Sequence, residues 1–169
     1  MIMHRRHFIT LLGSLTAAGI VARGAWAGLF SHDTAQPTKE FSVHMSNQEW
    51  KDKLSPKAYR VLREQGTERA FTSPLNDEHR HGNFYCAGCK NKLFSSEQKF
   101  NSGTGWPSFW APVDSGAVGT TTDYKIGVAR TEVHCADCGG HLGHVFEDGP
   151  KPTGLRYCMN GVAMEFKPE

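Results

Sequence analysis

Five cysteines stand out in this chain, because four of them form two Cys-x-x-Cys pairs and the fifth has no partner. The pairs are Cys86 with Cys89 and Cys135 with Cys138. Two residues between cysteines allow a tight turn to aim both sulfurs at one ion, and a second turn completes the tetrahedron that zinc prefers. Four thiolates leave no open position, so the pairs predict one structural zinc ion per chain rather than a catalytic metal.

Two other interpretations of the pairs stay open. They could form two disulfides, which persist in oxidising compartments. Alternatively, one of them could be a redox pair, although the βαβ pattern of thioredoxin-like sites is missing. We favour zinc, and the 45 residues between Cys89 and Cys135 predict a site that ties distant parts of one domain together rather than a small zinc finger.

Cys158, the unpaired cysteine, lies in the segment Gly154 to Phe166. If this segment is extended from its arginine onward, Arg156, Cys158 and Asn160 share one face, because side chains alternate along a strand. A guanidinium on that face favours the thiolate, which is the nucleophilic form of cysteine. The alternative is a small buried cysteine in a core strand. The polar neighbours favour the nucleophile.

Two further stretches have the composition of a reactive site. The stretch GGHLGHVF places His141 and His144 three residues apart among glycines, and histidines position and transfer protons near neutral pH. They could also bind metal, but four cysteines already fill a zinc site. In the stretch GTGWPSFW, Trp106 stands between Gly and Pro, which suits the wall of a pocket, whereas Trp110 is expected in the core.

The elements that must position these residues are mostly strands. Ser46 and Glu49 have capping-box spacing, which predicts a short helix to about Leu54. Ser-Pro then predicts a second helix over Pro56–Gln65, with Gly66 as its stop. Beyond that glycine, short runs such as GNFYCAGC, YKIGVARTEVHC and GLRYCMNGVAMEF are separated by Gly, Pro, Asn and Asp clusters, which are strand and turn signals. The domain should be mainly β, with antiparallel strands.

Length and charge limit the remaining possibilities. A chain of 169 residues fits one domain with a core of its own. The net charge is +2, but the first 27 residues carry three arginines and no acid, which leaves −1 for the rest. Nothing in this charge balance argues for nucleic acid as a partner. Residues 28–45 are polar and aperiodic, so we expect a linker or arm there and the domain over residues 46–169.

Residues 1–27 have the layout of an export signal, with a positive start, an apolar run and small residues before an expected cleavage after Ala27. Arg5 and Arg6, followed by Phe8, resemble a twin-arginine signal. This predicts an exported, periplasmic protein with no stable membrane insertion after cleavage. The apolar run is short for a spanning helix, which needs about 20 apolar residues, but an uncleaved membrane anchor stays an alternative.

Together these motifs resemble the type B methionine sulfoxide reductases. The resemblance rests on NSGTGWPSF, on RTEVHCADCGGHLGHVFEDGPKPTGLRYCMN and on the paired Cys-x-x-Cys units, and it covers about Ser46 to Phe166. It implies a β-tent of two antiparallel sheets with short N-terminal helices and a structural zinc site. It also implies that Cys158 is the catalytic cysteine. The other implied active-site residues are Trp106, His141, His144, Phe146 and Asn160, with Arg156 close by and with Trp106, Phe146 and Arg156 as substrate contacts.

The resemblance implies the chemistry as well. The Cys158 thiolate would attack the sulfur of a methionine R-sulfoxide in an oxidised protein and become a sulfenic acid. His141 and His144 would position the proton for the oxygen, and Trp106 would hold the methyl group. Many relatives carry a resolving cysteine where this chain has Thr104, so a thioredoxin-like protein or a small thiol would have to reset Cys158 directly. We expect the chain to work as a monomer.

Functions of other classes fit some of the same residues. The chain could be a zinc-stabilised protein-binding module in which Cys158 is merely buried, or a small secreted disulfide scaffold. One zinc ion per chain would exclude the scaffold. Turnover of a sulfoxide peptide with a chemical thiol would separate the enzyme from the binding module.

Overall fold

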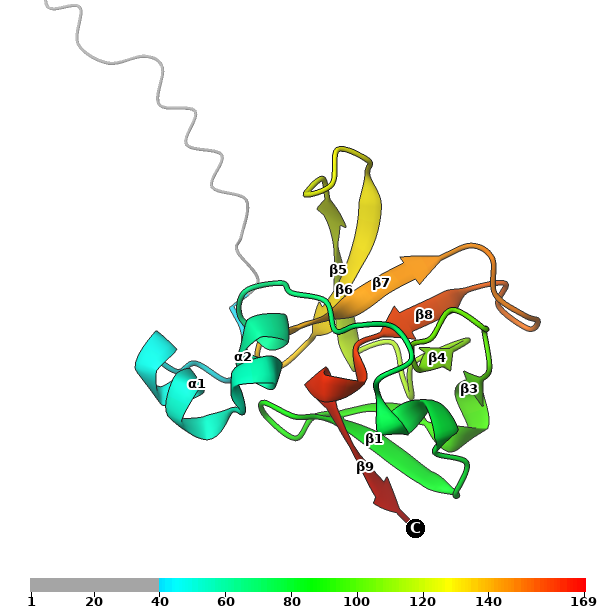
Figure 1. Cartoon of the computed structure of the whole chain (residues 1–169), viewed down its shortest axis with the longest axis horizontal. Helices are drawn as coiled ribbons and strands as arrows, with labels where there is room; N and C mark the ends of the chain where they lie inside the picture. Colours follow the sequence, from blue (N-terminus) through cyan, green and yellow to red (C-terminus); the bar gives the residue numbers. More distant parts are fainter. Residues whose placement is uncertain (1–39) are drawn as a thin grey trace, which may run out of the picture. The chain divides into compact units, whose positions relative to one another are not determined.

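The computed structural model describes residues 40–169, which fold around two antiparallel sheets (Figure 1). The smaller sheet has the strand order β2 (Lys92–Ser95), β1 (Gly82–Cys86) and β9 (Met164–Pro168). The larger sheet has the order β3 (Lys99–Phe100), β4 (Ser108–Phe109), β8 (Arg156–Met159), β7 (His141–Phe146), β6 (Arg130–Cys135) and β5 (Val118–Asp123). The expected mainly β fold of two antiparallel sheets is confirmed. The expected export signal lies outside the described residues.

Two short α-helices precede the strands, as the sequence predicts. In α1 (Asn47–Lys53), the Glu49 N–H donates to Ser46 Oγ at 3.3 Å, and the Ser46 N–H donates to the Glu49 carboxylate at 2.7 Å. This is the expected capping box. In α2 (Pro56–Leu62), Ser55 Oγ accepts a backbone N–H of the first turn at 3.2 Å. Local serine chemistry therefore sets where both helices begin.

The second helix ends three residues before the predicted Gln65. Gln65 adopts φ = 51°, which lies in the left-handed region and outside the helix. The Gly66 N–H then reaches back to the Arg60 carbonyl at 2.9 Å. A β-carbon at Gly66 would lie 2.8 Å from that carbonyl oxygen, so the close approach requires glycine. Gly66 thus closes the turn after the helix.

The hydrophobic core lies between the two sheets and beneath the helices. Its largest fully buried side chains include Trp50, Phe84, Phe94, Phe109, Leu93, Leu142 and Met159. Phe94 of the smaller sheet stacks on Phe109 of the larger sheet, with 4.4 Å between ring centroids. This contact joins the inner faces of the sheets. Trp110, which the sequence predicts in the core, is only half-buried.

Residues 40–45, the last part of the expected linker, lie against the turn between β6 and β7. The Val43 N–H donates to the Asp137 carbonyl at 2.9 Å. The Phe41 ring meets the His134 ring edge-on, with 5.7 Å between centroids. Val43 and Met45 also pack on the core. This part of the chain is therefore packed on the domain, while the boundary at residue 46 stays a prediction.

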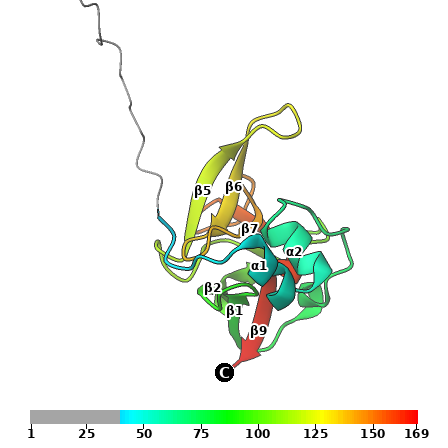
Figure 2. The ribbon, with the colours of Figure 1, turned by 90° about the vertical axis from the view of Figure 1, so that its left-hand side faces the viewer.

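β5 and β6 form a hairpin that extends away from the rest of the domain (Figure 2). The run YKIGVARTEVHC, predicted as one strand, becomes β6 only from Arg130 onward. Its first half forms the connection at the hairpin tip, where Tyr124, Ile126 and Val128 are exposed.

The segment from Arg156 to Phe166 is also divided, which corrects the expectation of one extended run. β8 ends at Met159, and the 3-10 helix η3 (Gly161–Ala163) separates it from β9. The Gly161 and Val162 N–H groups donate to the Glu68 carboxylate instead of continuing a strand ladder. A side chain from a distant loop therefore turns the chain here. Two further 3-10 helices, η1 (Pro74–Asp77) and η2 (Ser96–Gln98), lie in connections.

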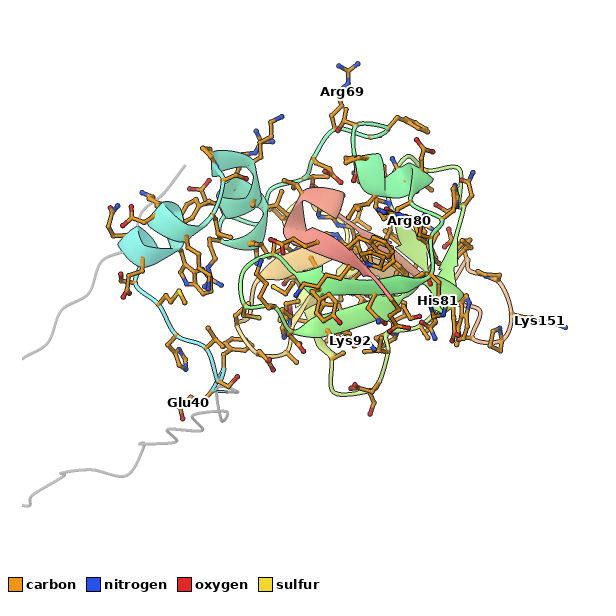
Figure 3. All side chains as sticks on the ribbon, turned by 90° about the horizontal axis from the view of Figure 1, so that it is seen from below. Glu40, Arg69, Arg80, His81, Lys92 and Lys151 are labelled. Carbon is orange, nitrogen blue, oxygen red and sulfur yellow. The ribbon has the colours of Figure 1, made fainter. Side chains whose placement is uncertain are left out.

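The surface of the described domain carries charges at separate places. Arg69 and Lys151 extend away from the ribbon at different points of the domain (Figure 3). Among residues 40–169, no helix is long and apolar enough to cross a bilayer.

Candidate active site

Cys158 lies in β8, between the neighbouring strands β4 and β7. It is directly opposite Ser108 of β4 and His144 of β7. Directly opposite residues of antiparallel strands project from the same face of a sheet. Cys158 is half-buried, so its sulfur stays within reach of a substrate. The sheet register thus brings the predicted nucleophile and one predicted histidine together.

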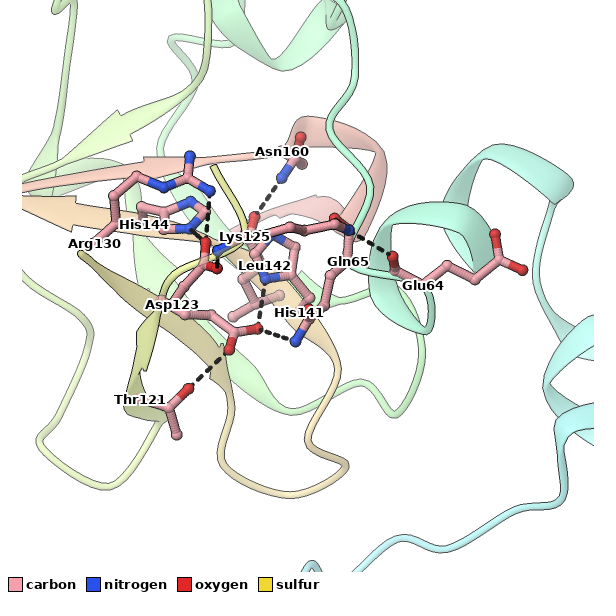
Figure 4. A network of polar contacts seen from close by, with 11 residues as sticks. Glu64, Gln65, Thr121, Asp123, Lys125, Arg130, His141, Leu142, His144 and Asn160 are labelled. Atoms are coloured by element: carbon pink, nitrogen blue, oxygen red, sulfur yellow. Dashed lines mark hydrogen bonds and ion pairs between the residues drawn. The ribbon is translucent and has the colours of Figure 1, made fainter. Parts of the chain in front are cut away.

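His144 is held by a carboxylate from the next hairpin. Its Nε2 lies 2.8 Å from Asp123 Oδ2, which also accepts from Arg130 Nη2 at 2.5 Å (Figure 4). The Lys125 backbone N–H, followed by His144 and Arg130, lowers the pKa of Asp123, so this carboxyl is ionised. Burial lowers the pKa of His144 and outweighs the opposing effect of Asp123. Near pH 7 the imidazole is neutral, with Nε2–H donating to Asp123 and Nδ1 left as the acceptor nitrogen.

His141 forms a second histidine–carboxylate pair. Its ring is buried, and its Nδ1 lies 2.6 Å from Glu132 Oε1. The hydrogen bond to His141 is the main cause of the lowered pKa of Glu132, which also accepts from the Thr121 hydroxyl at 2.8 Å. The His141 and His144 rings meet edge-on, with 5.4 Å between centroids. The two predicted histidines therefore belong to one polar network, but His144 is the one opposite the sulfur.

Trp106 and Asn160 are connected through Glu68. The Trp106 Nε1–H donates to the Glu68 carbonyl at 3.1 Å, and the Glu68 N–H donates to Asn160 Oδ1 at 2.9 Å. The Asn160 amide donates in turn to the Leu142 carbonyl at 3.0 Å (Figure 4). Asn160 is buried just past the end of β8, and its backbone is still extended, so the extended run that the sequence predicts from Arg156 holds as far as Asn160. Its amide ties the tryptophan loop to β7.

Arg156 and Phe146 form the remaining side of the site. They are directly opposite each other on β8 and β7, with the guanidinium 4.4 Å from the ring centroid. Arg156 also donates two hydrogen bonds to Asp148, both at 2.8 Å. Asp148 is the main cause of the raised pKa of Arg156, and the charge and hydrogen bond of Cys158 contribute further. The predicted guanidinium therefore acts on the sulfur from within the same strand.

Thr104 lies against the predicted nucleophile. Its Oγ1 is 3.7 Å from Cys158 Sγ, which is hydrogen-bond distance for sulfur. The threonine at the position of the expected resolving cysteine thus reaches the reactive sulfur, as a cysteine there would.

Sequence reasoning missed the carboxylates that hold the site. Asp123, Glu132 and Asp148 each bind a predicted site residue through the carboxylate. Glu68 connects Trp106 and Asn160 through its backbone carbonyl and N–H. Glu132 left a signal, because an acid inside the strand run RTEVHC requires a partner when it is buried. Asp123, at the end of a polar run, left none.

The four paired cysteines converge on one point, as predicted. Their sulfurs all lie within 4.8 Å of one another, and none of the five cysteines forms a disulfide. Cys86 Sγ and Cys138 Sγ are 3.8 Å apart, and Cys89 Sγ and Cys135 Sγ are 3.5 Å apart. Neighbouring sulfurs around a tetrahedral zinc with bonds of about 2.3 Å lie about 3.8 Å apart. The donor set and its spacing therefore fit zinc.

Both Cys-x-x-Cys turns have the same backbone form. Lys90 N–H donates to the Cys86 carbonyl at 2.9 Å, and Gly139 N–H donates to the Cys135 carbonyl at 3.0 Å. The residue after each second cysteine has a positive φ, 67° at Lys90 and 66° at Gly139. The first turn follows β1 of the smaller sheet and the second follows β6 of the larger sheet. A metal here would join the two sheets, which matches the expected link between distant parts of the domain.

The difficulty of ionising all four thiols together indicates a cation at this point. Interactions with Cys135, Cys138 and Cys89, together with burial, raise the pKa of the Cys86 thiol. Four neighbouring thiolates therefore need a positive ion to exist together. Asn91 supports the cluster from outside, because its Nδ2–H lies 3.5 Å from Cys135 Sγ and also donates to the Ala117 carbonyl at 2.9 Å.

Comparison with known proteins places most of the described domain in one family. Residues 54–168 match the SelR domain. The chain is 50% identical over 129 residues to the peptide methionine sulfoxide reductase MsrB of Leptospira interrogans, which covers 76% of this chain and 98% of that protein. It is 52% identical over 126 residues to the MsrB of Agrobacterium fabrum, covering 75% and 93% of the two chains. The MsrB of Bradyrhizobium diazoefficiens is 50% identical over 137 residues, covering 81% and 99%.

Proposed function

This chain belongs to the SelR-domain family of type B peptide methionine sulfoxide reductases, and we propose that it reduces methionine R-sulfoxide within oxidised proteins through a sulfenic acid on Cys158. The observation that carries the proposal is the position of the Cys158 sulfur. Cys158 is directly opposite His144 on the neighbouring strand, and its Sγ lies 3.7 Å from Thr104 Oγ1.

In the first step, the Cys158 thiolate attacks the sulfoxide sulfur of the substrate. The S–O bond of the sulfoxide breaks and the oxygen passes to Cys158, which leaves methionine and a sulfenic acid. Methionine gains two electrons and Cys158 loses two, and one proton is taken up by the oxygen. Arg156 favours the attacking form, because a guanidinium beside a thiol stabilises the thiolate.

The proton reaches the oxygen through a water molecule that the histidines position. The lowered pKa of His144 and its bond to Asp123 keep the ring in one tautomer, whose Nδ1 accepts from a water molecule that in turn donates to the sulfoxide oxygen. His141, fixed by Glu132, holds the neighbouring part of the network. Asn160 acts indirectly, because it positions the Trp106 loop through Glu68.

The substrate sulfur is held by apolar and cationic surfaces. Trp106, half-buried and fixed through its indole N–H, forms a wall for the methyl group. Phe146 and Arg156, whose guanidinium lies over the Phe146 ring, line another part of the site. A methyl group bound on one side and an oxygen bound near His144 on the other would distinguish the two epimers at sulfur.

An external thiol resets the enzyme. Thr104 cannot form a disulfide, and the other four cysteines of the described domain form the metal cluster. The reductant thiol therefore condenses with the sulfenic acid of Cys158, releases water and forms a mixed disulfide, which a second thiol reduces. A thioredoxin-like protein with an exposed cysteine, or a small thiol, fits this requirement.

Zinc held by Cys86, Cys89, Cys135 and Cys138 would stabilise the fold by joining the sheets. Four sulfur ligands leave no position for substrate, so the ion takes no part in the reaction.

We also propose that the protein is exported to the periplasm in folded, metallated form and works there as a monomer. Arg5, Arg6 and the apolar run that follows support this route. Loading of zinc before export would protect the thiolates from oxidation, because metal-bound sulfur does not form disulfides without loss of the metal.

The deciding experiment is turnover of two peptides that differ only in the epimer of their methionine sulfoxide, with dithiothreitol as reductant. We expect reduction of the R-sulfoxide peptide and no reduction of the S-sulfoxide peptide. Absence of turnover with both peptides, in protein that carries one zinc per chain, would favour the binding module instead.

A further inference from the structure

We propose that the Thr104 hydroxyl is the hydrogen-bond donor that stabilises the charged sulfur of Cys158, and that Ser102 accepts this hydroxyl when the sulfur is a neutral thiol. This inference rests on the proposed function, in which Cys158 is the nucleophile. It is carried by a row of three hydroxyl groups, those of Ser108, Ser102 and Thr104, which ends 3.7 Å from Cys158 Sγ.

The direction of the row is fixed at its buried end. The hydroxyl of Ser108, which is fully buried, donates its single proton to the Trp106 carbonyl at 3.1 Å. Ser108 Oγ must then accept from the Ser102 hydroxyl, 2.7 Å away. This uses the only proton of Ser102. Ser102 can therefore only accept from Thr104, whose N–H already points to it at 3.4 Å.

Thr104 is left with one hydroxyl proton and two acceptors. Ser102 Oγ lies 2.9 Å from Thr104 Oγ1, and Cys158 Sγ lies 3.7 Å from it. A thiol sulfur is a weak acceptor, so beside neutral Cys158 the hydroxyl donates to Ser102. Hydrogen bonds to a charged acceptor are roughly twice as strong as neutral ones, so beside a thiolate the hydroxyl rotates to the sulfur. The rotation follows the charge on Cys158.

The charged groups around the sulfur do not replace this donor. Arg156, on the same strand, donates its Nε–H and an Nη2–H to Asp148. His144, on β7, donates its Nε2–H to Asp123 and in its neutral form presents only an acceptor nitrogen elsewhere. On the β4 side, Ser108 has committed its proton to the Trp106 carbonyl. Thr104 is therefore the neutral hydroxyl that can turn its proton to the sulfur.

The test measures alkylation of Cys158 by iodoacetamide as a function of pH in the zinc-loaded protein, followed by mass spectrometry of the peptide that contains it. Thr104→Val keeps the shape of the side chain and removes the hydroxyl. We expect the midpoint of its alkylation curve to rise by about one pH unit, which is about a tenfold smaller thiolate fraction below the midpoint. Thr104→Ser should keep the wild-type midpoint, because it restores the donor.

Ser102→Ala should shift the alkylation midpoint in the opposite direction. Without the competing acceptor, the Thr104 hydroxyl has only the sulfur to donate to, so the midpoint should fall below that of the wild type. A general loosening of the loop would instead change both variants in one direction. Thr120→Val, a matched change at an exposed position of β5, should leave the curve unchanged.

An unchanged midpoint in Thr104→Val, or an equal rise in Thr104→Ser, would overturn the proposal. A rise in Ser102→Ala would overturn the competition between the two acceptors. Zinc content and melting temperature are recorded for every variant, so that only folded protein is compared. Alkylation needs no sulfoxide, so failure here is distinguishable from failure of the proposed reductase function.

Discussion

His144 and Cys158 occupy directly opposite positions of β7 and β8, with Asp123 of β5 holding the imidazole at 2.8 Å. The proposed nucleophile and its histidine are therefore positioned by strands of one sheet. A shift of either strand by one residue would move its side chains to the opposite face. The register of the sheet is thus part of the active site.

Cys158→Ser should abolish reduction of methionine sulfoxide and leave the fold intact. Serine has nearly the same size, and the sulfur is only half-buried, so we expect a melting temperature close to that of the wild type. The measurement is turnover of a sulfoxide peptide with dithiothreitol. Activity retained by this variant would remove Cys158 from the mechanism.

The protein should lose stability as pH falls, and His144 should contribute to this loss. Burial lowers its folded-state pKa below the ordinary value of 6.5. Between these two values the unfolded chain binds more protons than the folded one, so stability is lost as pH falls through this window. His144→Gln removes the titration, and we therefore expect the wild type to lose more melting temperature than this variant between pH 7.5 and pH 5.5. Equal losses in the two proteins would contradict the assigned direction of the shift.

The residues of the site were predictable from the sequence to the extent that their chemistry is local. Cys158, His141 and Trp106 stand in short stretches whose composition already suggests reactivity. The helix starts were predictable for the same reason, since a capping serine acts within one turn. The contact of Asp123 with His144 was not, because it depends on how β5, β6 and β7 align in space.

The break after β8 shows the same limit in part. The Asn160-Gly161 pair is a local turn signal, but the group that binds the backbone there, the Glu68 carboxylate from a distant loop, could not be inferred from the segment itself. The predicted extended run to Phe166 was therefore wrong from Gly161 onward. Asn160, the last extended residue before the break, binds the Glu68 N–H and the Leu142 carbonyl.

Cys89→Ser or Cys138→Ser should release zinc and destabilise the domain strongly. The cluster joins the turn after β1 to the turn after β6, and zinc binding free energy is largely folding free energy. A loss of about 4 kcal/mol would lower the melting temperature by roughly 10 °C, and we expect at least that. Cys158→Ser is the matched control, because it makes the same chemical change outside the cluster. A cysteine-to-serine variant of the cluster that kept both zinc and melting temperature would require another assignment for these residues.

Replacement of Arg5 and Arg6 by lysine should trap the precursor in the cytoplasm. Both residues lie outside the described part of the chain, and the prediction rests on the twin-arginine pattern of the sequence alone. Fractionation of cells that express the two forms would measure the exported share. Normal export of the double-lysine variant would point to the general secretory route.

Recycling of Cys158 should proceed without an internal disulfide. Cys86, Cys89, Cys135 and Cys138 form the cluster that is proposed to hold zinc. In a single turnover without reductant we expect one methionine per chain and a sulfenic acid that dimedone traps. Mass spectrometry should detect no disulfide within the chain. A disulfide between Cys158 and a cluster cysteine, with release of zinc, would mean that a metal ligand acts as the resolving thiol.

Thr104→Cys tests the same point from the other side. The Thr104 Oγ1 lies 3.7 Å from Cys158 Sγ, and a disulfide needs about 2.05 Å between sulfurs, so a small side-chain rotation would bring an introduced thiol into reach. We expect this variant to form one disulfide with Cys158 per turnover and to lose the dimedone adduct. Thr120→Cys, an exposed control on β5, should keep the adduct. If Thr104→Cys accumulated sulfenic acid like the wild type, the loop could not bring a resolving thiol to Cys158. The need for an external thiol would then follow from the geometry of the loop rather than from the missing cysteine.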